Sequence, residues 1–354
     1  MVSRLQKTCK DHRNRWHELR LLAGDKTTLA LPESTSLYKY FGAHKGQQGL
    51  GPIAVELCCL FDLISRAPLR FVFDKVCTSE HKLICKLIQS LKKGDLLLLD
   101  NGFYNQTTFN KILSRQAHFI IPAKTTIRPQ VMHTLGPGDY LCQITDSKSK
   151  IILTVRVVFV YRNGFRRRRL VTTLLDPFLF PVSELANLYH MRWDIETFYR
   201  DFKHSLKATS WHCKSPSSFH QELLVHMIAL CLIRMAMLEA SHLANVTIGK
   251  LSFSRALIET RLFLKFLLSS ADGLLWSALW SAFVLRCSKH LVQLKPDRHF
   301  SRDRQHYRKK SRGIVEPRRR GRKRKSSCEH LTQLDTFIKP ETISDCKNRL
   351  FLLS

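Results

Sequence analysis

The fold assignment depends on the segment Pro181–Leu206, PVSELANLYHMRWDIETFYRDFKHSL. On a helix with about 100° per residue, its polar groups fall within about 80° of one another. These groups are Tyr189, Arg192, Glu196, Arg200 and Lys203. The apolar side chains lie about 180° to 240° around the same helix. They are Met191, Ile195, Phe198 and Phe202. The pattern predicts one amphipathic helix, from about Ser183 to Leu206, that packs on a core and presents a carboxylate flanked by cations.

A plainer interpretation of this helix is also open. Glu196 pairs at helical spacing with Arg192 and Arg200 on a face that is only solvated. Two observations favour a functional face instead. The helix follows two aspartates that are associated with strands, and the whole chain is basic.

The two aspartates are Asp25, in LLAGDKTTLA, and Asp100, in LLLLDNGFYN. Because aspartate is a poor strand former, its presence at an apolar strand needs a reason. A turn or Asx cap is one reason. The other is a cage of carboxylates for two divalent cations, with hard oxygen ligands that suit Mg²⁺ or Mn²⁺. Two such ions, about 3.5–4 Å apart, stabilise the attacking and leaving oxygens of a phosphodiester displacement.

Strands and helices alternate around these aspartates, which predicts a mixed α/β sheet. The predicted strands are 21–31, 53–64, 69–76, 96–99 and 117–122. A helix is expected over 79–91 and another from Asn105 or Thr107 to Ser114, whereas Phe41–Gly51 is expected to be a flexible loop. Residues 140–145, 150–161 and 167–174 predict an antiparallel insertion of hairpins. Further helices are expected over 218–243 and 252–268.

The charge balance points to a polyanionic partner. Lys and Arg number 58 and Asp and Glu 28, which gives a formal net charge of +30. Residues 298–325 contribute +12 of this charge, so +18 is spread over the rest of the chain. This distribution fits a DNA-binding surface and a basic arm. The run Arg166, Arg167, Arg168 and Arg169 follows a predicted hairpin turn, and it either touches the DNA backbone or is merely solvated.

The eleven cysteines show no paired metal-binding spacing and are interpreted as reduced residues of a cytoplasmic protein. The N-terminus has no apolar signal segment. The apolar stretches Leu223–Leu238 and Gly273–Leu285 are interpreted as buried helices, so no contact with a membrane is expected.

Three motifs resemble those of cut-and-paste DDE transposases of the insertion-sequence-four type. They are Asp25 with Thr27, Asp100-Asn-Gly-Phe-Tyr, and Tyr189-x2-Arg192-x3-Glu196-x6-Lys203. The third is the most specific, because four residue types match at fixed spacing. The resemblance covers roughly Leu21–Arg234, and Lys26 departs from it, because a small residue is common at that position.

The resemblance implies a ribonuclease-H-like fold: a mixed sheet with flanking helices, an antiparallel β insertion, and then helices and a basic tail. It makes Asp25, Asp100 and Glu196 the catalytic ligands of two Mg²⁺ ions, with Mn²⁺ as an alternative. Tyr189, Arg192 and Lys203 would hold phosphates at the cut DNA end, and Arg200 would assist. The implied reaction is cleavage at transposon ends and strand transfer, by a homodimer in a paired-end complex near the bacterial nucleoid.

The resemblance also divides the chain into regions. Residues 1–19 are expected to be an N-terminal remnant, because the family usually has a separate DNA-binding domain before the first aspartate. Residues 20–122 form the first part of the catalytic core, 123–181 the β-rich insertion, and 182–295 the helical completion of the core. Residues 296–354 form a basic, partly disordered C-terminal region.

Three other functions remain open from the sequence. A chain without the N-terminal domain can act as a DNA-binding regulator that does not cleave alone. A simple ribonuclease-H-like nuclease would nick DNA without joining it. An inactive remnant is the third, against which the presence of all three carboxylates argues.

Overall fold

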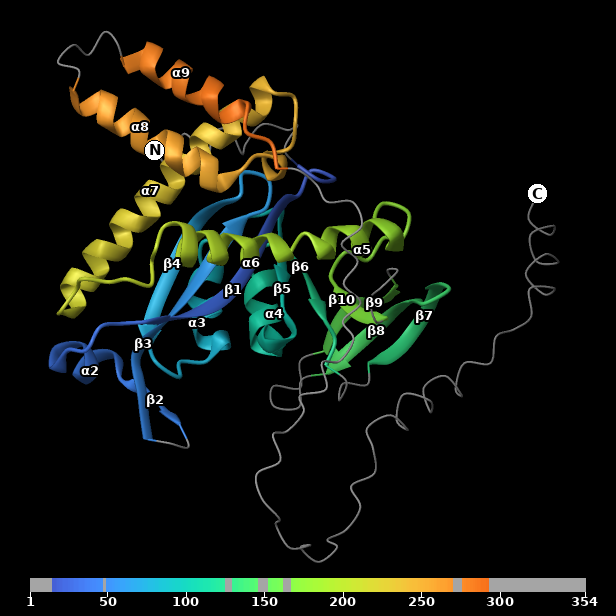
Figure 1. The fold of residues 1–354 in the computed structure, drawn as a ribbon. Helices are drawn as coiled ribbons and strands as arrows, with labels where there is room; N and C mark the ends of the chain where they lie inside the picture. Colours follow the sequence, from blue (N-terminus) through green and yellow to red (C-terminus); the bar gives the residue numbers. More distant parts are fainter. Residues whose placement is uncertain are drawn as a thin grey trace, which may run out of the picture. The chain divides into compact units, whose positions relative to one another are not determined.

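A mixed sheet, ten-stranded within the described residues, runs through the protein (Figure 1). The computed structural model describes residues 15–46, 49–124, 129–145, 152–161, 167–269 and 276–292, all within one unit, Met1–His299. The strand order is β2-β3-β1-β5-β6-β10-β9-β8-β7, and β4 also pairs with β3. The strands are β1 (Arg20–Ala30), β2 (Ala43–Gly46), β3 (Gly49–Asp62), β4 (Ala67–Lys75), β5 (Asp95–Leu99), β6 (His118–Pro122), β7 (Gln130–Gly136), β8 (Asp139–Thr145), β9 (Ile152–Val160) and β10 (Arg168–Thr172).

The centre of the sheet has two kinds of pairing. Strand β1 pairs antiparallel with β3 and parallel with β5, and β5 pairs parallel with β6. All five residues of β5 are buried, as expected for a strand covered on both faces. The order β4-β3-β1-β5-β6 with these directions confirms the ribonuclease-H-like fold predicted from the sequence.

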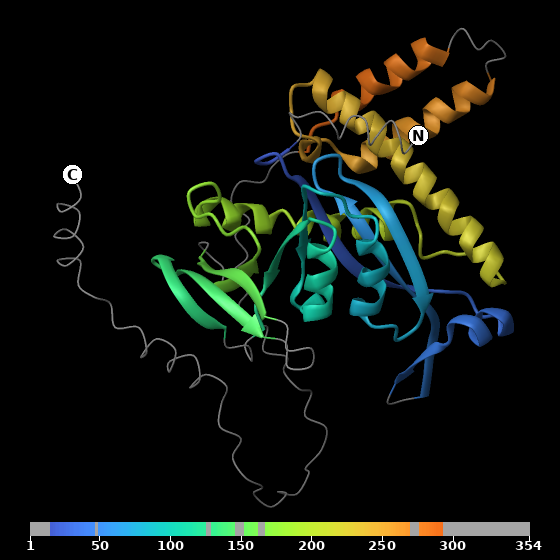
Figure 2. The ribbon, with the colours of Figure 1, turned by 180° about the vertical axis from the view of Figure 1, so that it is seen from behind.

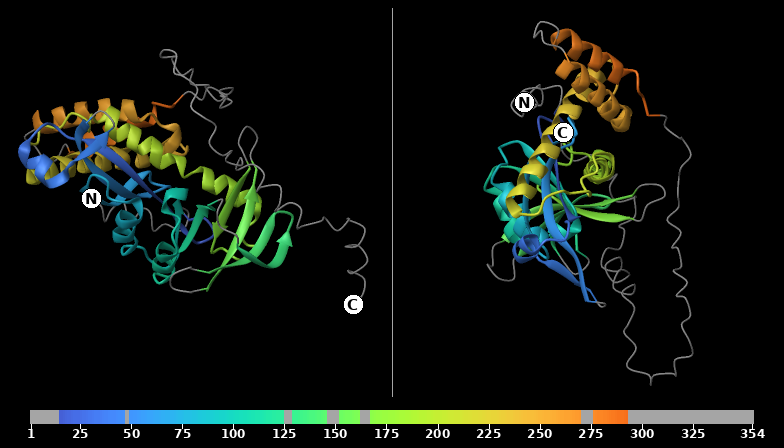
Figure 3. Two further views of the ribbon diagram at one scale, coloured as in Figure 1. Left: turned by 90° about the horizontal axis from the view of Figure 1, so that it is seen from below. Right: turned by 60° about the vertical axis from the view of Figure 1, so that its left-hand side comes forward.

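Helices cover both faces of this central part. The helices of the described residues are α2 (Thr35–Phe41), α3 (Glu80–Ile88), η2 (Asn101–Phe103), α4 (Gln106–Leu113), α5 (Val182–His190), α6 (Trp193–Arg200), η3 (Asp201–Ser205), α7 (Pro216–Leu243), η4 (Ile248–Lys250), α8 (Phe253–Ser269) and α9 (Trp276–Ser288). Helix α6 lies over one face, and α3 and α4 cover the other, which is seen from behind in Figure 2. In the views of Figure 3 the strands lie between these two helical layers.

Alternating side chains of β1 feed two separate apolar cores. Leu21 and Ala23 pack in the core that includes Phe198 of α6, and Leu22 packs in the core that includes Ile84 of α3. Successive side chains of a strand point to opposite faces, so a strand buried on both faces is apolar at every position. Gly24 meets this constraint most tightly, because a Cβ atom there would lie 2.8 Å from the Ile84 side chain.

The β-rich region extends the same sheet. Strands β7, β8, β9 and β10 pair antiparallel in sequence, and β10 then pairs with β6. The antiparallel hairpins expected here are therefore present, with β7 as an additional, largely exposed strand. The domain boundaries drawn from the sequence stay predictions.

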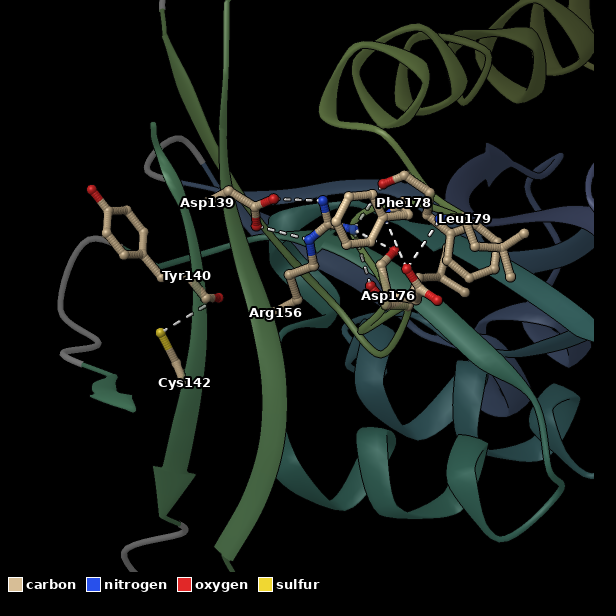
Figure 4. Close-up of polar contacts among 9 residues, drawn as sticks. Asp139, Tyr140, Cys142, Arg156, Asp176, Phe178 and Leu179 are labelled. Carbon is tan, nitrogen blue, oxygen red and sulfur yellow. Dashed lines mark hydrogen bonds and ion pairs between the residues drawn. The ribbon is translucent and has the colours of Figure 1, made fainter. Parts of the chain in front are cut away.

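A buried ion pair fastens this region to the segment that enters α5 (Figure 4). Arg156 of β9 is fully buried, and its Nε and Nη2 donate to Asp139 at 2.8 and 2.6 Å. Its Nη1 donates to the carbonyl oxygens of Asp176 and Phe180 at 3.1 and 2.8 Å and of Leu174 at 3.4 Å. Arg156 thus holds the chain between β10 and α5 at several points.

The long helix α7 is mostly a core element. It begins with a capping box between Ser215 and Ser218 and buries Phe219, Leu223 and Leu230. Among the described helices it alone is long and apolar enough to cross a membrane by length and composition, and 56% of its most apolar window is buried. Packing therefore accounts for much of its apolar sequence.

Two local predictions are wrong. The expected single helix Ser183–Leu206 consists of α5, α6 and the π-helical η3, with a tightened turn at Met191 and Arg192 where backbone bonds span three residues. A 3₁₀-like turn and a π turn differ in residues per turn, which a constant-period wheel misses. The expected loop Phe41–Gly51 contains the β2–β3 hairpin, in which Gly49 takes a φ of 112°. Residues 296–354 lie outside the described part of the chain.

Candidate active site

Two of the three predicted carboxylates lie side by side where β5 ends against the middle of β1. Gly24 of β1 pairs with Leu99 of β5, so the next residues, Asp25 and Asp100, follow one another across the parallel ladder. Glu196 lies on α6, which packs over β1. The fold thus brings three residues from distant parts of the sequence to the same edge of the sheet.

The electrostatics of Asp25 show that the three carboxylates influence one another. Burial raises the pKa of Asp25 to about 6, and the negative charges of Glu196 and Asp100 add to this effect. The backbone N–H of Lys26, which donates to Asp25 Oδ1 at 2.8 Å, and the charge of Arg192 act in the opposite direction. Burial is therefore the main reason why Asp25 releases its proton less readily than an exposed aspartate does.

Asp100 does not act as a helix cap. It occupies the position before η2, but its side chain makes no capping hydrogen bond, and it is exposed. Within the described residues no ion pair involves Asp25 or Asp100. The turn or cap interpretation of Asp100 is thus not supported.

Arg192 is the cation at the centre of this group. It is only 4% exposed, and its Nη2 donates to Glu196 Oε1 at 2.8 Å. Burial acts to lower the pKa of Arg192, but Tyr189, the two aspartates and the bond to Glu196 raise it overall. Its Nε is buried without a hydrogen-bond partner among the described residues. The positive charge of Arg192 therefore interacts with all three carboxylates, and its Nε has no hydrogen-bond partner among the described residues.

Tyr189 faces the strand below it more than it faces solvent. It is 4% exposed, and its hydroxyl donates to the carbonyl of Leu99, next to Asp100, at 3.3 Å. Burial raises its pKa to about 12, with Arg192, Asp100 and Arg168 among the charges that act on it. Its contact with a phosphate stays a prediction, and its hydrogen bond to Leu99 connects α5 to the end of β5.

Lys203 and Arg200 have different surroundings. Lys203 Nζ donates to the carbonyl of Thr28 on β1 at 2.9 Å, and burial lowers its pKa, partly offset by the charge of Glu56. Arg200 is exposed at the end of α6. The buried Glu56 also accepts from Thr28 Oγ1 at 2.9 Å and lies 3.3 Å from Lys26 Nζ. The unusual Lys26 therefore directs its charge to Glu56.

The arginine run is divided between different contacts. The positive charge of Arg168 on β10 acts to lower the pKa of Tyr189, so Arg168 is near enough to influence the candidate site. Arg169 donates to the carbonyl of Lys124 at 2.8 Å, and Arg167 stacks over the Phe159 ring. Arg166 lies outside the described residues. Among Arg167, Arg168 and Arg169, Arg168 is thus the one whose charge acts on Tyr189.

The residues fit divalent metal ions by their chemistry. Three carboxylates from separate elements supply hard oxygen donors. Burial is the main cause of the raised pKa of Asp25, and the negative charges of Glu196 and Asp100 add to it. As placed, the described part of the chain has no group of three His, Cys, Asp or Glu side chains arranged to hold an ion. Glu196 Oε1 accepts from Arg192, and no hydrogen bond to Oε2 is present within the described residues.

Sequence reasoning missed Tyr199 and Glu56. Tyr199, three residues after Glu196, hydrogen-bonds to both β1 and β3. A tyrosine beside the apolar face of the quoted helix is the only signal, and it does not distinguish a bonded hydroxyl from ordinary packing. Glu56 gives a clearer signal, because it is a charged residue inside an apolar strand.

The chain matches the family model described as transposase DDE domain over residues 16–232. This range is more than half of the chain and includes all three carboxylates. The chain belongs to the transposase DDE family. The family predicted from the sequence motifs is thereby confirmed.

Two curated relatives are transposases or probable transposases, and the first supports the insertion-sequence-four type. This chain is 28% identical over 256 residues to transposase InsG for insertion sequence element IS4 of Escherichia coli (strain K12). The match covers 68% of this chain and 58% of the relative. It is 22% identical over 169 residues to a probable transposase for insertion sequence element IS5377 of Geobacillus stearothermophilus, covering 45% and 44%. This chain thus spans about half the length of the curated relatives it matches.

A solved structure of a piggyBac transposase synaptic complex with hairpin DNA is also similar to this DDE family member. The match has a TM-score of 0.41 and 9% sequence identity, and it covers 75% of this chain and 53% of the other.

Proposed function

We propose that this protein is a metal-dependent DNA nuclease and strand transferase that cleaves transposon ends and joins them to target DNA. The observation that carries the proposal is the convergence of Asp25, Asp100 and Glu196 at one edge of the sheet, within a transposase DDE domain. Asp25, Asp100 and Glu196 would hold Mg²⁺ or Mn²⁺, which when bound activates a nucleophile and stabilises charge on the phosphate.

The other residues of the site would bind and orient DNA. Arg192 has an unused buried donor and is held against Glu196, so it is placed to bind a phosphate once that carboxylate takes a metal. Arg168 supplies positive charge from the β-rich region, and Arg167, Arg169, Arg200 and Lys203 add to it. Tyr189 would position the phosphate beside Arg192. Partners are DNA at the transposon ends and target, and a second copy in a paired-end complex in the bacterial cytoplasm.

The test is cleavage of a labelled duplex carrying the element's terminal repeat, with Mg²⁺ and without it. Glu196→Gln should abolish cleavage and leave DNA binding intact, because it removes a ligand charge and preserves shape. The control is Glu184→Gln on α5, which makes the same chemical change at a carboxylate that pairs, within the described residues, with His17 at 2.8 Å. That variant should cleave as the wild type does.

The alternative functions give different results in this assay. Binding without cleavage by the wild-type chain, in Mg²⁺ and in Mn²⁺, would overturn the proposal and identify a DNA-binding regulator or an inactive remnant. Nicked ends without joined products would identify a nuclease that does not transpose. Cleavage that survives Glu196→Gln would exclude the assigned carboxylates.

A further inference from the structure

Tyr199 makes an unusual pair of hydrogen bonds. It is 6% exposed, and its hydroxyl donates to the carbonyl oxygen of Asp25 at 2.6 Å and accepts from the N–H of Cys59 at 3.2 Å. Asp25 and Cys59 are partners in the antiparallel ladder of β1 and β3. A helix side chain therefore bridges two paired strands at the residue that carries the first carboxylate.

This bridge links the positions of two carboxylates. Tyr199 is one helical turn after Glu196, so the same short segment of α6 carries Glu196 and holds the backbone of Asp25. A tyrosine side chain has few rotatable bonds, and the Tyr199 ring packs against Phe198 with centroids 5.0 Å apart. A movement of the Asp25 backbone relative to Glu196 would therefore break the hydrogen bond from the Tyr199 hydroxyl to Asp25.

Two ion pairs fasten the same helical segment from other elements. Asp194, at the start of α6, pairs with Arg66 at 2.6 Å, and Asp201, after its end, pairs with the buried Arg234 at 2.8 Å. They lie seven residues apart, on either side of Tyr199. The pairs restrain the helix from rotating or sliding, so the position of the Tyr199 hydroxyl is well defined.

We infer that Tyr199 is a positioning residue whose hydroxyl sets the spacing between Asp25 and Glu196 for metal binding. The inference rests on the proposed function of these two carboxylates. Tyr199 itself is buried between α6 and the sheet and does not need to touch metal or DNA. Groups that orient metal ligands in this way typically change metal affinity about 10- to 100-fold when they are removed.

The experiment compares Tyr199→Phe with the wild type for Mn²⁺ affinity, measured from the spectroscopic signal of free Mn²⁺ without DNA. We expect about 10-fold weaker binding by the variant. Its DNA affinity should be unchanged, and its cleavage rate should recover at saturating Mn²⁺. The matched control is Tyr104→Phe, which removes a buried hydroxyl that has no hydrogen-bond partner among the described residues. That variant should bind Mn²⁺ as the wild type does.

The outcomes separate this inference from the proposed function. If Glu196→Gln and wild type bind Mn²⁺ equally, the proposed site is wrong and Tyr199 loses its role with it. If Glu196→Gln loses Mn²⁺ but folded Tyr199→Phe binds normally, the positioning role alone is overturned. Should Tyr199→Phe not fold, hydrogen exchange of the Cys59 amide in the wild-type protein replaces it. Slower exchange on adding Mn²⁺ would support the link, and unchanged exchange would overturn it.

Discussion

Arg156 and Arg192 are both buried arginines bonded to carboxylates, but their surroundings differ. Arg156 forms a two-point pair with Asp139 and donates its remaining nitrogen to backbone carbonyls, so its buried nitrogens are all bonded (Figure 4). Among the described residues, Arg192 has one bond to Glu196, an Nε without a hydrogen-bond partner, and two further carboxylates whose charges act on it. The first arrangement is complete without a ligand. The second is left incomplete, which is expected where a ligand must bind.

The largest expected effect is on the complete arrangement. Arg156→Met should lower the free energy of unfolding by about 3–5 kcal/mol, because it leaves Asp139 buried without its partner. Urea unfolding followed by circular dichroism measures this. The double variant with Asp139→Leu should recover much of the loss, since no charge then stays buried. A loss below about 1 kcal/mol for Arg156→Met would show that the pair does not organise this region.

A smaller effect is expected on adding metal to the incomplete arrangement. Mg²⁺ at about 100 times its dissociation constant should stabilise the wild-type protein by about 2.7 kcal/mol, if the ion binds only the folded state. Asp100→Asn should remove most of this gain, because it removes one of the three ligand charges. Thermal unfolding with and without Mg²⁺ provides the measurement. An equal gain in both proteins would mean that the ion binds elsewhere.

The turn beside Arg156 should be less sensitive than the ion pair. Asp176 Oδ1 accepts from the N–H groups of Phe178 and Leu179 at 2.8 and 3.1 Å, but the side chain is exposed (Figure 4). Asp176→Ala should cost about 1 kcal/mol of unfolding free energy, the size of an ordinary net hydrogen bond. Asp176→Asn keeps an acceptor oxygen and should stay near wild type. A full loss in the Asn variant would show that charge, and not the turn, is what matters.

Much of the central fold was predictable because its signals are local. Strand β5 contains an unbroken apolar run, Leu96–Leu99, directly before Asp100, and β1 and β3 also contain apolar runs. The approach of Asp25 to Asp100 follows from parallel pairing, which the sequence allowed but did not specify. The pairing of Arg192 with Glu196, which was expected from their spacing, is present in the structure. The pair lies at the tightened turn into α6, where side chains four residues apart are still in contact.

The features that were not predicted from the sequence depend on contacts between residues that lie far apart in the chain. The π-helical turn after Arg200 accompanies the bond between Asp201 and Arg234, 33 residues away. The role of Tyr199 depends on Asp25, 174 residues away. The spacing of apolar residues is a property of one segment, so it indicates which residues share a face but not which other segment packs against that face.

The smallest expected effect makes the comparison sharpest. Without metal, Asp100→Asn should change the free energy of unfolding by no more than about 0.5 kcal/mol, because Asp100 is exposed and makes no capping bond. The variant gives up attraction to Arg192 but also relieves repulsion of Asp25, and these two effects oppose one another. Asp139→Asn, the same chemical change, should cost several times more, since it leaves the buried Arg156 without an anion. Similar costs for the two variants in urea unfolding would mean that Asp100 is as much a structural residue as Asp139, and the contrast between the two arginine sites would no longer hold.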